Sequence, residues 1–316
     1  MDIIEYCGKK LYQLNYWKEQ KRYLFYRFRC WRRQKDISGL IDFFNANPLR
    51  AQLPWGNPSF IEQATRRFFY HGSTWEERIS LIEKHVEILE AKLTPETLGR
   101  IYVKGEPITL WQEECLGRTI KANLIFGAGQ RKEGCLSLSI LFDDTWLYQI
   151  IFWVSGSIEC PRISIGAIQG LLNGAEIIKN LTKAYFGYRT KNLVFWCLRC
   201  FAEELGCKEI WGVTNQGYYA QNGIRIDRKL KTDFAEFWRE CEGSPASDPR
   251  FYSMPIREHR KSMEELKPSK RAQHRKRFAK LDEIKQSIHT NIKSFSSSAS
   301  FSEISSGSSE NFFWHS

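Results

Sequence analysis

The sequence lacks any run of about 18 uncharged apolar residues, the length that a membrane-spanning helix requires. The longest apolar run, residues 146–154, has the length of a buried strand. Residues 16–31 interleave aromatic residues with Lys and Arg, so they do not follow the basic-then-apolar order of a secretory signal peptide. We therefore expect no helical membrane span and a cytoplasmic location, with peripheral contact to the inner membrane left open.

The sequence also lacks a disulfide framework and a metal-binding set. Its nine cysteines are odd in number and irregularly spaced, which favours a reducing compartment. Cys197 and Cys200 form a CxxC pair, but the pair lies inside an expected helix, without a second pair or a nearby His. We expect these cysteines to be buried and expect no metal. The sequence shows no DNA-binding motif, and spacing alone assigns no Ser-His-Asp or Cys-His set.

What is present is the composition of a globular protein with excess positive charge. The chain has 316 residues, 42% of them hydrophobic and 14% aromatic, which is enough to build a sizeable core. The formal net charge is +11 and the isoelectric point is about 9.2. This balance favours anionic partners such as nucleic acid, phospholipid or phosphorylated ligands. It indicates neither which of them binds nor the oligomeric state.

The clearest local pattern is a strand, two helices and a second strand. Residues 163–167 alternate apolar and polar side chains, as a half-buried strand does. Helical spacing follows over residues 177–185 and 193–205, and Gly187 stands where a left-handed C-cap would end the first helix. The apolar residues 210–213 predict the second strand. The pattern therefore predicts a β-α-α-β crossover.

The joint between the two expected helices, residues 187–192, carries Arg189 and Lys191. A helix N-terminus has partial positive charge and unpaired N–H groups, so it disfavours nearby cations. Either a phosphate or carboxylate lies between these side chains and the amides, or the two cations are solvated loop residues. The first alternative predicts an anion-binding site at the joint.

Three further strands precede the crossover, at residues 119–126, 135–142 and 146–154. An antiparallel meander that leads into a crossover predicts an α+β fold with a mixed sheet, behind a helical N-terminal region. The expected domains are a basic aromatic arm (1–37), a helical region (38–118), an α+β core domain (119–285) and a disordered Ser-rich tail (286–316).

Two basic segments are candidate contact surfaces. Residues 18–35 alternate cations with aromatic residues and predict an amphipathic helix that presents Leu24, Phe28 and Trp31. Such a helix can bind RNA or the anionic inner-membrane surface, or it can pack on the protein with its charges solvated. Residues 270–280 form a second basic helix with the same two alternatives.

Five separated motifs stand in order along the second half of the chain: IGAIQG, AYFGYRTKNL, GVTNQGYY, DFAEFW and KPSKRAQHRKRFAKLDEI. Together they resemble the VirK/YbjX family of enterobacterial proteins, over most of residues 40–285. The resemblance implies a cytoplasmic bacterial protein that supports expression or correct localisation of an outer-membrane surface virulence factor. It also implies a part in envelope adaptation, including tolerance of antimicrobial peptides. It supplies no catalytic residues.

The expected strand order resembles, more distantly, that of GNAT-type acyltransferases. That resemblance implies that coenzyme A or acyl carrier protein is the acyl donor, bound by Gly187, Arg189, Thr190 and Lys191. It implies that Asn215 lines the cleft and that Tyr218 or Tyr219 protonates the leaving thiolate. In that family a glycine-rich loop joins strand to helix directly, whereas here an extra helix follows Gly170. The alternative is a non-enzymatic basic module that binds RNA or the inner membrane.

Overall fold

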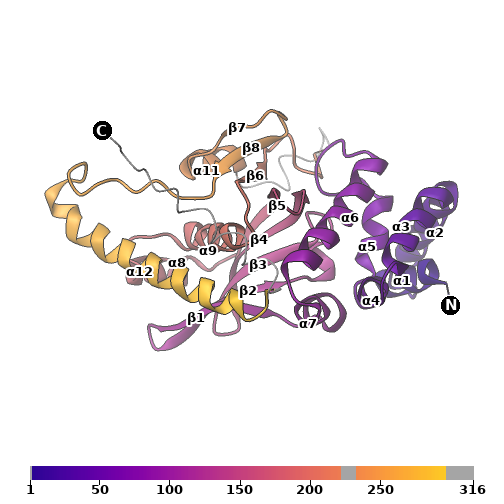
Figure 1. Cartoon of the computed structure of the whole chain (residues 1–316), viewed down its shortest axis with the longest axis horizontal. Helices are drawn as coiled ribbons and strands as arrows, with labels where there is room; N and C mark the ends of the chain where they lie inside the picture. Colours follow the sequence, from indigo (N-terminus) through magenta and orange to yellow (C-terminus); the bar gives the residue numbers. More distant parts are fainter. Residues whose placement is uncertain (1, 222–232, 297–316) are drawn as a thin grey trace, which may run out of the picture.

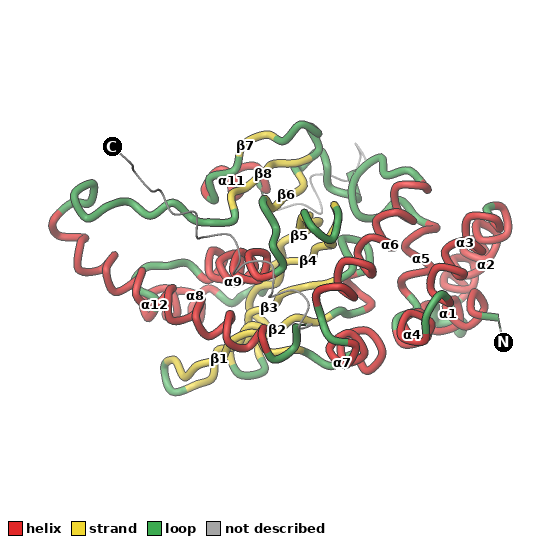
Figure 2. Tube along the Cα trace, viewed as in Figure 1, coloured by secondary structure: helices red, strands yellow, loops and turns green. Residues whose placement is uncertain are grey.

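The computed structural model describes residues 2–221 and 233–296, and its centre is one mixed β-sheet (Figures 1 and 2). The strand order is β1-β2-β3-β4-β5-β6-β8-β7. The strands are β1 (Ile108–Cys115), β2 (Arg118–Ile125), β3 (Leu136–Phe142), β4 (Thr145–Gly156), β5 (Pro161–Gly170), β6 (Glu209–Val213), β7 (Ser244–Pro245) and β8 (Phe251–Pro255). The predicted α+β class with a mixed sheet is confirmed.

All neighbouring strands pair antiparallel except β5 and β6, which are parallel. This confirms the predicted crossover. The parallel pairing is short, since it joins only Ile163–Ile165 to Ile210–Gly212. At its end β5 carries a bulge, because the partners of Ile151 and Phe152 on β4 skip Gly166. The two parallel strands thus stop pairing where the bulge bends β5.

Helices precede the sheet and cover it. Those before the sheet are α1 (Ile3–Leu11), α2 (Trp17–Arg32), α3 (Gln34–Asn45), α4 (Pro48–Gly56), α5 (Ser59–Thr65), α6 (Trp75–Lys92), α7 (Pro95–Leu98) and the π-helix η1 (Gly99–Lys104). The helices that follow the first strands of the sheet are the 3-10 turn η2 (Ala128–Gln130), α8 (Ala175–Ala184), α9 (Thr190–Glu204), α11 (Phe234–Glu240) and α12 (Pro268–Lys293).

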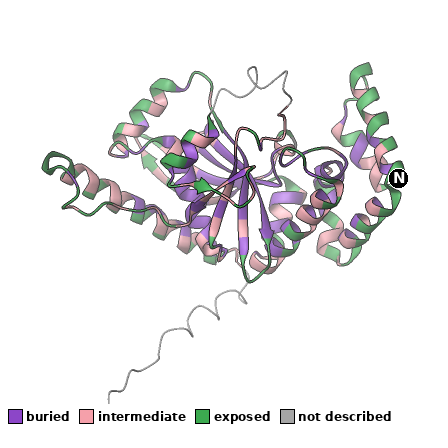
Figure 3. Ribbon diagram, turned by 90° about the horizontal axis from the view of Figure 1, so that it is seen from above, coloured by how far each residue is buried: buried purple, intermediate pink, exposed green. Residues whose placement is uncertain are grey.

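The sheet is covered on both faces. Successive side chains of a strand point to opposite faces, so Phe152 and Trp153 of β4 show what lies on each. The Phe152 ring lies 6.2 Å from that of Phe201 on α9, and the Trp153 ring lies 5.4 Å from that of Phe69, between α5 and α6. All four side chains are buried. Figure 3 shows that buried residues run along the central strands of the sheet. Truncation of a buried ring of this kind costs about 3–5 kcal/mol, so these contacts fix the helices on the sheet.

Helix boundaries follow the predicted caps closely. Gly187 has φ of +80° after α8, as a left-handed C-cap requires. Helix α6 starts with a capping box formed by Thr74 and Glu77. Cys197 and Cys200 are buried in α9 as free thiols, as expected.

Three expectations about boundaries need correction. Strand β1 lies inside the range 38–118 that we assigned to helices, and α3 runs across the boundary between residues 37 and 38. Helix α12 continues past residue 286, where we placed the start of the tail, because Ile288 and Ile292 are buried against the domain. Residues 297–316 of the expected tail lie outside the described residues.

Within residues 2–221 and 233–296, no helix is both long and apolar enough to cross a lipid bilayer.

Candidate functional site

A buried carboxyl group, that of Glu133, lies beside the bulge of β5. Glu133 is only 5% exposed and precedes β3 by three residues. Its backbone presses on the bulge so closely that a Cβ at Gly166 would lie 1.9 Å from the Glu133 carbonyl oxygen. Glycine at position 166 is therefore required for this approach. The close packing places Glu133 where β5 and β6 stop pairing.

The segment between α5 and α6 joins Glu133 to the loop after β6. The backbone N–H of Phe69 donates to the Lys132 carbonyl oxygen at 2.8 Å, and that of His71 donates to the Gly217 carbonyl oxygen at 2.8 Å. Tyr70, between them, forms a β-bridge with Tyr218. Phe69 has φ of +69°, an uncommon conformation for a residue with a Cβ. These contacts fix the chain on both sides of the carboxyl group.

The Tyr218 hydroxyl donates a hydrogen bond to the Glu133 carboxylate at 3.1 Å, and the rings of Tyr218 and Tyr219 lie 4.9 Å apart. Burial raises the pKa of Glu133 to about 7, although the bond from Tyr218 and the charges of Lys132 and Arg131 act in the opposite direction. Burial also raises the pKa of Tyr219 to about 12, and that of Tyr218 rises for the same cause. Glu133 is thus poised to exchange a proton near neutral pH, and both phenols hold theirs.

Asn215 lies in the same loop but makes a different contact. Its side-chain oxygen accepts a hydrogen bond from the backbone N–H of Phe234 at 2.8 Å, at the start of α11. Asp233 caps the same helix through the N–H of Glu236. Asn215 therefore supports α11, and its place in a catalytic cleft stays a prediction.

The cations of the joint between α8 and α9 have partners within the chain. The Arg189 guanidinium pairs with the Glu240 carboxylate at 2.7 Å, and the Lys191 ammonium lies 3.8 Å from the centre of the Phe237 ring. Burial lowers the pKa of Lys191, while the charge of Glu240 raises it. Thr190 is buried at the first turn of α9, which has no side-chain cap. These partners explain in part how two cations are tolerated at a helix start.

A pocket of about 370 Å³ nevertheless opens at this joint, between α8, the first turn of α9 and Tyr148 of β4. Four cations line it: Lys179, Lys183, Arg189 and Lys191. No carboxylate lines it, so its field favours an anion. Gly187 does not line this pocket. The carbonyl oxygen of the preceding residue, Phe186, accepts hydrogen bonds from Gln273 and Arg277 of α12. Among the described residues, no hydrogen bond or ion pair joins this joint to Tyr218 or Tyr219.

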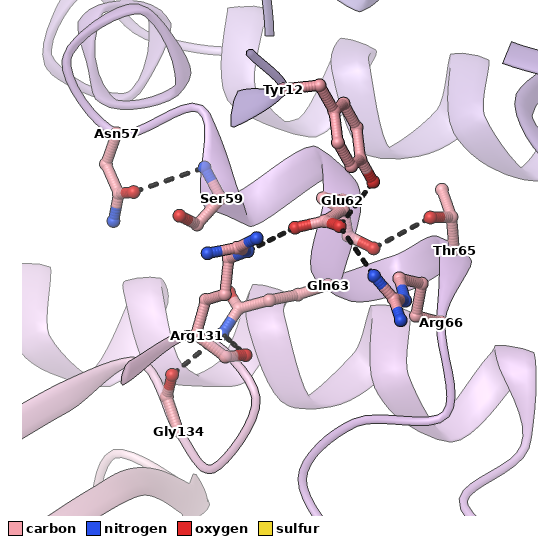
Figure 4. A network of polar contacts seen from close by, with 9 residues as sticks. All are labelled: Tyr12, Asn57, Ser59, Glu62, Gln63, Thr65, Arg66, Arg131 and Gly134. Carbon is pink, nitrogen blue, oxygen red and sulfur yellow. Dashed lines mark hydrogen bonds and ion pairs between the residues drawn. The ribbon is translucent and has the colours of Figure 1, made fainter. Parts of the chain in front are cut away.

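A second buried carboxyl group, that of Glu62 on α5, ties the N-terminal helices to the sheet (Figure 4). The Tyr12 hydroxyl donates to it at 2.5 Å, Arg66 lies 3.4 Å away, and Arg131 forms an ion pair with it. The neighbouring Gln63 donates to the Gly134 carbonyl oxygen at 2.7 Å. This network holds the segment of residues 131–134 in place, and with it the carboxyl group beside the bulge.

Sequence reasoning missed Glu133 and Glu62. No local pattern identifies either residue, since the tyrosine that donates to each carboxylate lies 50 or more positions away in the sequence. The one available signal was the pair of glycines at positions 134 and 166, which allow backbones to approach closely.

Fold and site together define a mixed α/β protein that places a buried carboxyl–tyrosine pair where its two parallel strands separate. The chain belongs to the family described as "Protein of unknown function (DUF535)", whose model matches residues 15–290. This confirms the resemblance to the VirK/YbjX family.

Two relatives illustrate the membership. An uncharacterized protein of Haemophilus influenzae is 25% identical over 272 residues, which are 84% of this chain and 88% of that protein. The uncharacterized protein YbjX of Escherichia coli K12 is 32% identical over 115 residues, 36% of this chain and 34% of that protein. No solved structure matches this chain significantly.

Proposed function

We propose that this protein transfers an acyl group from a thioester of coenzyme A or acyl carrier protein to an acceptor with a hydroxyl or amino group. The observation that carries the proposal is the hydrogen-bonded pair of Glu133 and Tyr218, buried where β5 and β6 stop pairing. A thioester that enters between the two strands would meet a base and an acid within hydrogen-bond distance of each other. The strand order and the bulge of β5 also support the GNAT-type plan.

In this mechanism the Glu133 carboxylate accepts the proton of the acceptor group as it attacks the thioester carbonyl carbon. A bond forms between acceptor and acyl carbon, and the carbon–sulfur bond breaks. Tyr218, or Tyr219 beside it, gives its proton to the departing thiolate. Because Tyr218 donates to Glu133 at rest, the proton that Glu133 has taken up can return to the tyrosinate and close the cycle. A base with a pKa of about 7 suits this role at neutral pH.

The cationic pocket at the joint supports binding of the donor. Its four Lys and Arg side chains and the uncapped first turn of α9 suit the phosphates of coenzyme A or of a phosphopantetheine arm. In the cell, we place this activity in the role that the VirK/YbjX resemblance implies. That role is support of an outer-membrane surface virulence factor and envelope adaptation, including tolerance of antimicrobial peptides.

The test uses acetyl-coenzyme A and palmitoyl-coenzyme A with hydroxylamine as the acceptor, and it measures thiol release and hydroxamate formation. Glu133→Gln should lower turnover by about 10²–10⁴-fold, the usual contribution of a general base, with the affinity for coenzyme A unchanged in calorimetry. Glu258→Gln is the matched control, because Glu258 also accepts a bond from a tyrosine and has a pKa raised by burial. Equal turnover in Glu133→Gln and wild type would refute the proposal.

A further inference from the structure

A pocket of about 400 Å³ opens between α2, the end of α5 and the start of α6. Six arginines line it: Arg29, Arg32, Arg33, Arg66, Arg67 and Arg78. No Asp or Glu lines it. We call this group the arginine pocket; it lies in the N-terminal helical region and shares no lining residue with the pocket at the joint.

The carboxylates near the arginine pocket neutralise few of its charges. Arg66 shares the buried Glu62 with Arg131, and Arg33 makes exposed contacts of 3.3–3.4 Å with Asp36 and Glu76. Arg32 and Arg67 make no ion pair with any described residue. Like charges held this close repel each other, so the arrangement favours a ligand with more than one negative charge.

Two arginines of the pocket wall have buried guanidinium nitrogens in spite of this repulsion. Arg78 is 5% exposed and donates to the carbonyl oxygens of Ala64 and Ser73, at 3.1 and 2.5 Å. Burial and the charge of Arg67 lower the pKa of Arg78 to about 10. The Nε of Arg29 is buried without a hydrogen-bond partner among the described residues. A buried donor without a partner is costly, so its presence in the wall supports an oxygen-rich ligand.

Beside the arginine pocket, α2 exposes an apolar stripe of Trp17, Leu24, Phe28 and Trp31. The spacings of seven, four and three residues put all four on one face of the helix, along roughly 21 Å at 1.5 Å per residue. They are 60%, 64%, 51% and 70% exposed. Helix α2 lies at one end of the molecule, on the outer surface of the N-terminal helices (Figure 1). Large apolar side chains exposed together in this way mark a contact surface.

The arginine pocket borders the stripe at the last turn of α2. Successive residues of a helix are turned by about 100°, so Arg32 lies at the edge of the stripe, and Arg29 and Arg33 lie further round the helix, toward α5 and α6. We propose that this end of α2, with the stripe and the adjoining pocket, docks on a bilayer rich in anionic phospholipid. The stripe enters the boundary between headgroups and acyl chains, and the arginine pocket holds the lipid phosphates. Single-stranded RNA fits less well, because it prefers a cationic groove with stacking rings, and this stripe is convex and includes Leu24.

The test measures co-sedimentation of the full chain with vesicles of phosphatidylcholine alone, and of phosphatidylcholine mixed with phosphatidylglycerol, without an acyl donor. Wild type should bind the anionic vesicles and not the neutral ones. Arg32→Gln with Arg67→Gln should weaken binding by about 30-fold, since each cation near an anionic surface contributes about fivefold. The matched control, Lys208→Gln with Arg239→Gln, removes two exposed charges that lie outside both basic segments, before β6 and on α11, and should change little.

A second measurement tests insertion of the stripe. Phospholipids brominated on the acyl chain should quench part of the tryptophan fluorescence. Trp17→Phe with Trp31→Phe should reduce that quenching with little loss of binding, because phenylalanine keeps the face apolar. Phe28→Ser with Trp31→Ser should reduce binding itself by at least tenfold. All three positions are exposed, so the fold should be unaffected, which circular dichroism checks.

Three outcomes would overturn the inference. One is equal loss of binding in the Lys208 and Arg239 control, which would mean that net charge alone attracts the vesicles. Another is binding of oligouridylate, measured by fluorescence anisotropy, without binding of anionic vesicles. The third is a thermal shift with inorganic pyrophosphate that depends on Arg32 and Arg67, in a protein that does not bind anionic vesicles. That result would indicate a soluble phosphate ligand. Because no acyl donor is present, each result stands apart from the proposed acyl transfer.

Discussion

The joint at residues 187–192 and the arginine pocket are both clusters of cations beside a helix, but they differ in how far other side chains neutralise their charges. At the joint, Arg189 pairs with Glu240, and Lys191 lies over Phe237. In the arginine pocket, Arg32 and Arg67 have no ionic partner among the described residues. The comparison teaches that two cations at a helix start are explained in part by the fold itself, whereas converging arginines without an ionic partner favour an outside anion.

The two clusters also differ in their link to the Glu133–Tyr218 pair. Arg66, in the wall of the arginine pocket, contacts Glu62, and Glu62 holds Arg131 two residues before Glu133. The Arg66 guanidinium also lies 5.0 Å from the Phe68 ring, which packs at 6.0 Å against Tyr219. A ligand in the arginine pocket would therefore act on side chains that support the buried carboxyl–tyrosine pair.

The largest expected effect follows from breaking this link. Glu62→Gln leaves two arginine side chains without the buried carboxylate that Glu62 provides, and removal of one partner of a buried ion pair costs about 3–5 kcal/mol. We expect a loss of that size in the free energy of unfolding, measured with urea. Where the protein still folds, its affinity for anionic vesicles should hold or rise, because the arginine pocket then has one negative charge fewer beside it.

The control for this prediction is Glu76→Gln. Glu76 lies 3.4 Å from Arg33 near the same pocket, but its side chain is 67% exposed. An exposed ion pair contributes at most about 1 kcal/mol, so this variant should be nearly as stable as wild type. Similar losses in both variants would contradict the view that burial makes Glu62 important.

Local patterns predicted the part of the fold that local rules determine. The alternation in β2 to β5 and the helical spacing of α8 and α9 identified the meander and the crossover, and Gly187 marked the end of α8 correctly. Strands β7 and β8 were missed because they are short and lie among prolines.

Glu133 was missed for a different reason: its burial and its bond to Tyr218, 85 positions away, exist only in the folded chain. The arm was recognised as a candidate surface, but its six-arginine pocket was not, since three of those arginines follow α5 or belong to α6.

A second prediction tests the buried carboxyl group itself. A raised pKa means that the native state binds the proton of Glu133 more tightly than the unfolded chain does. The stability that this provides is present below about pH 4.5 and is lost as the pH rises through about 7, and the loss is about 3 kcal/mol. Gln at position 133 does not titrate. The free energy of unfolding of Glu133→Gln should therefore equal that of wild type at pH 4 and exceed it by about 3 kcal/mol at pH 8.

Comparison of the two proteins at each pH removes the contributions of all other titrating groups. The nearby Tyr218 keeps its proton throughout this range, because burial raises its pKa. Tyr218→Phe serves as a further probe, because it removes the bond that favours the charged form and should move the titration of Glu133 to higher pH. A constant difference between Glu133→Gln and wild type across this range would mean that the carboxyl group is solvated, and it would remove the basis of its proposed role as a base.

The smallest expected change in stability comes from the joint, where Arg189→Ala with Lys191→Ala separates structural from ligand-binding cations. The Arg189–Glu240 pair is largely exposed and contributes at most about 1 kcal/mol, and relief of repulsion at the helix start returns about 0.3–1 kcal/mol. Stability should thus fall by less than about 1 kcal/mol. Binding of coenzyme A, measured by calorimetry, should fall at least tenfold, because charge-assisted hydrogen bonds contribute about 1.5–3 kcal/mol each.

Arg118→Ala is the control, since it removes another exposed ion pair, with Asp143, and should leave the affinity for coenzyme A unchanged. Vesicle binding should also be unchanged in the double variant, because the arginine pocket is intact. A wild type without affinity for coenzyme A, together with normal cellular activity of the double variant, would show that the internal partners account fully for the two cations of the joint.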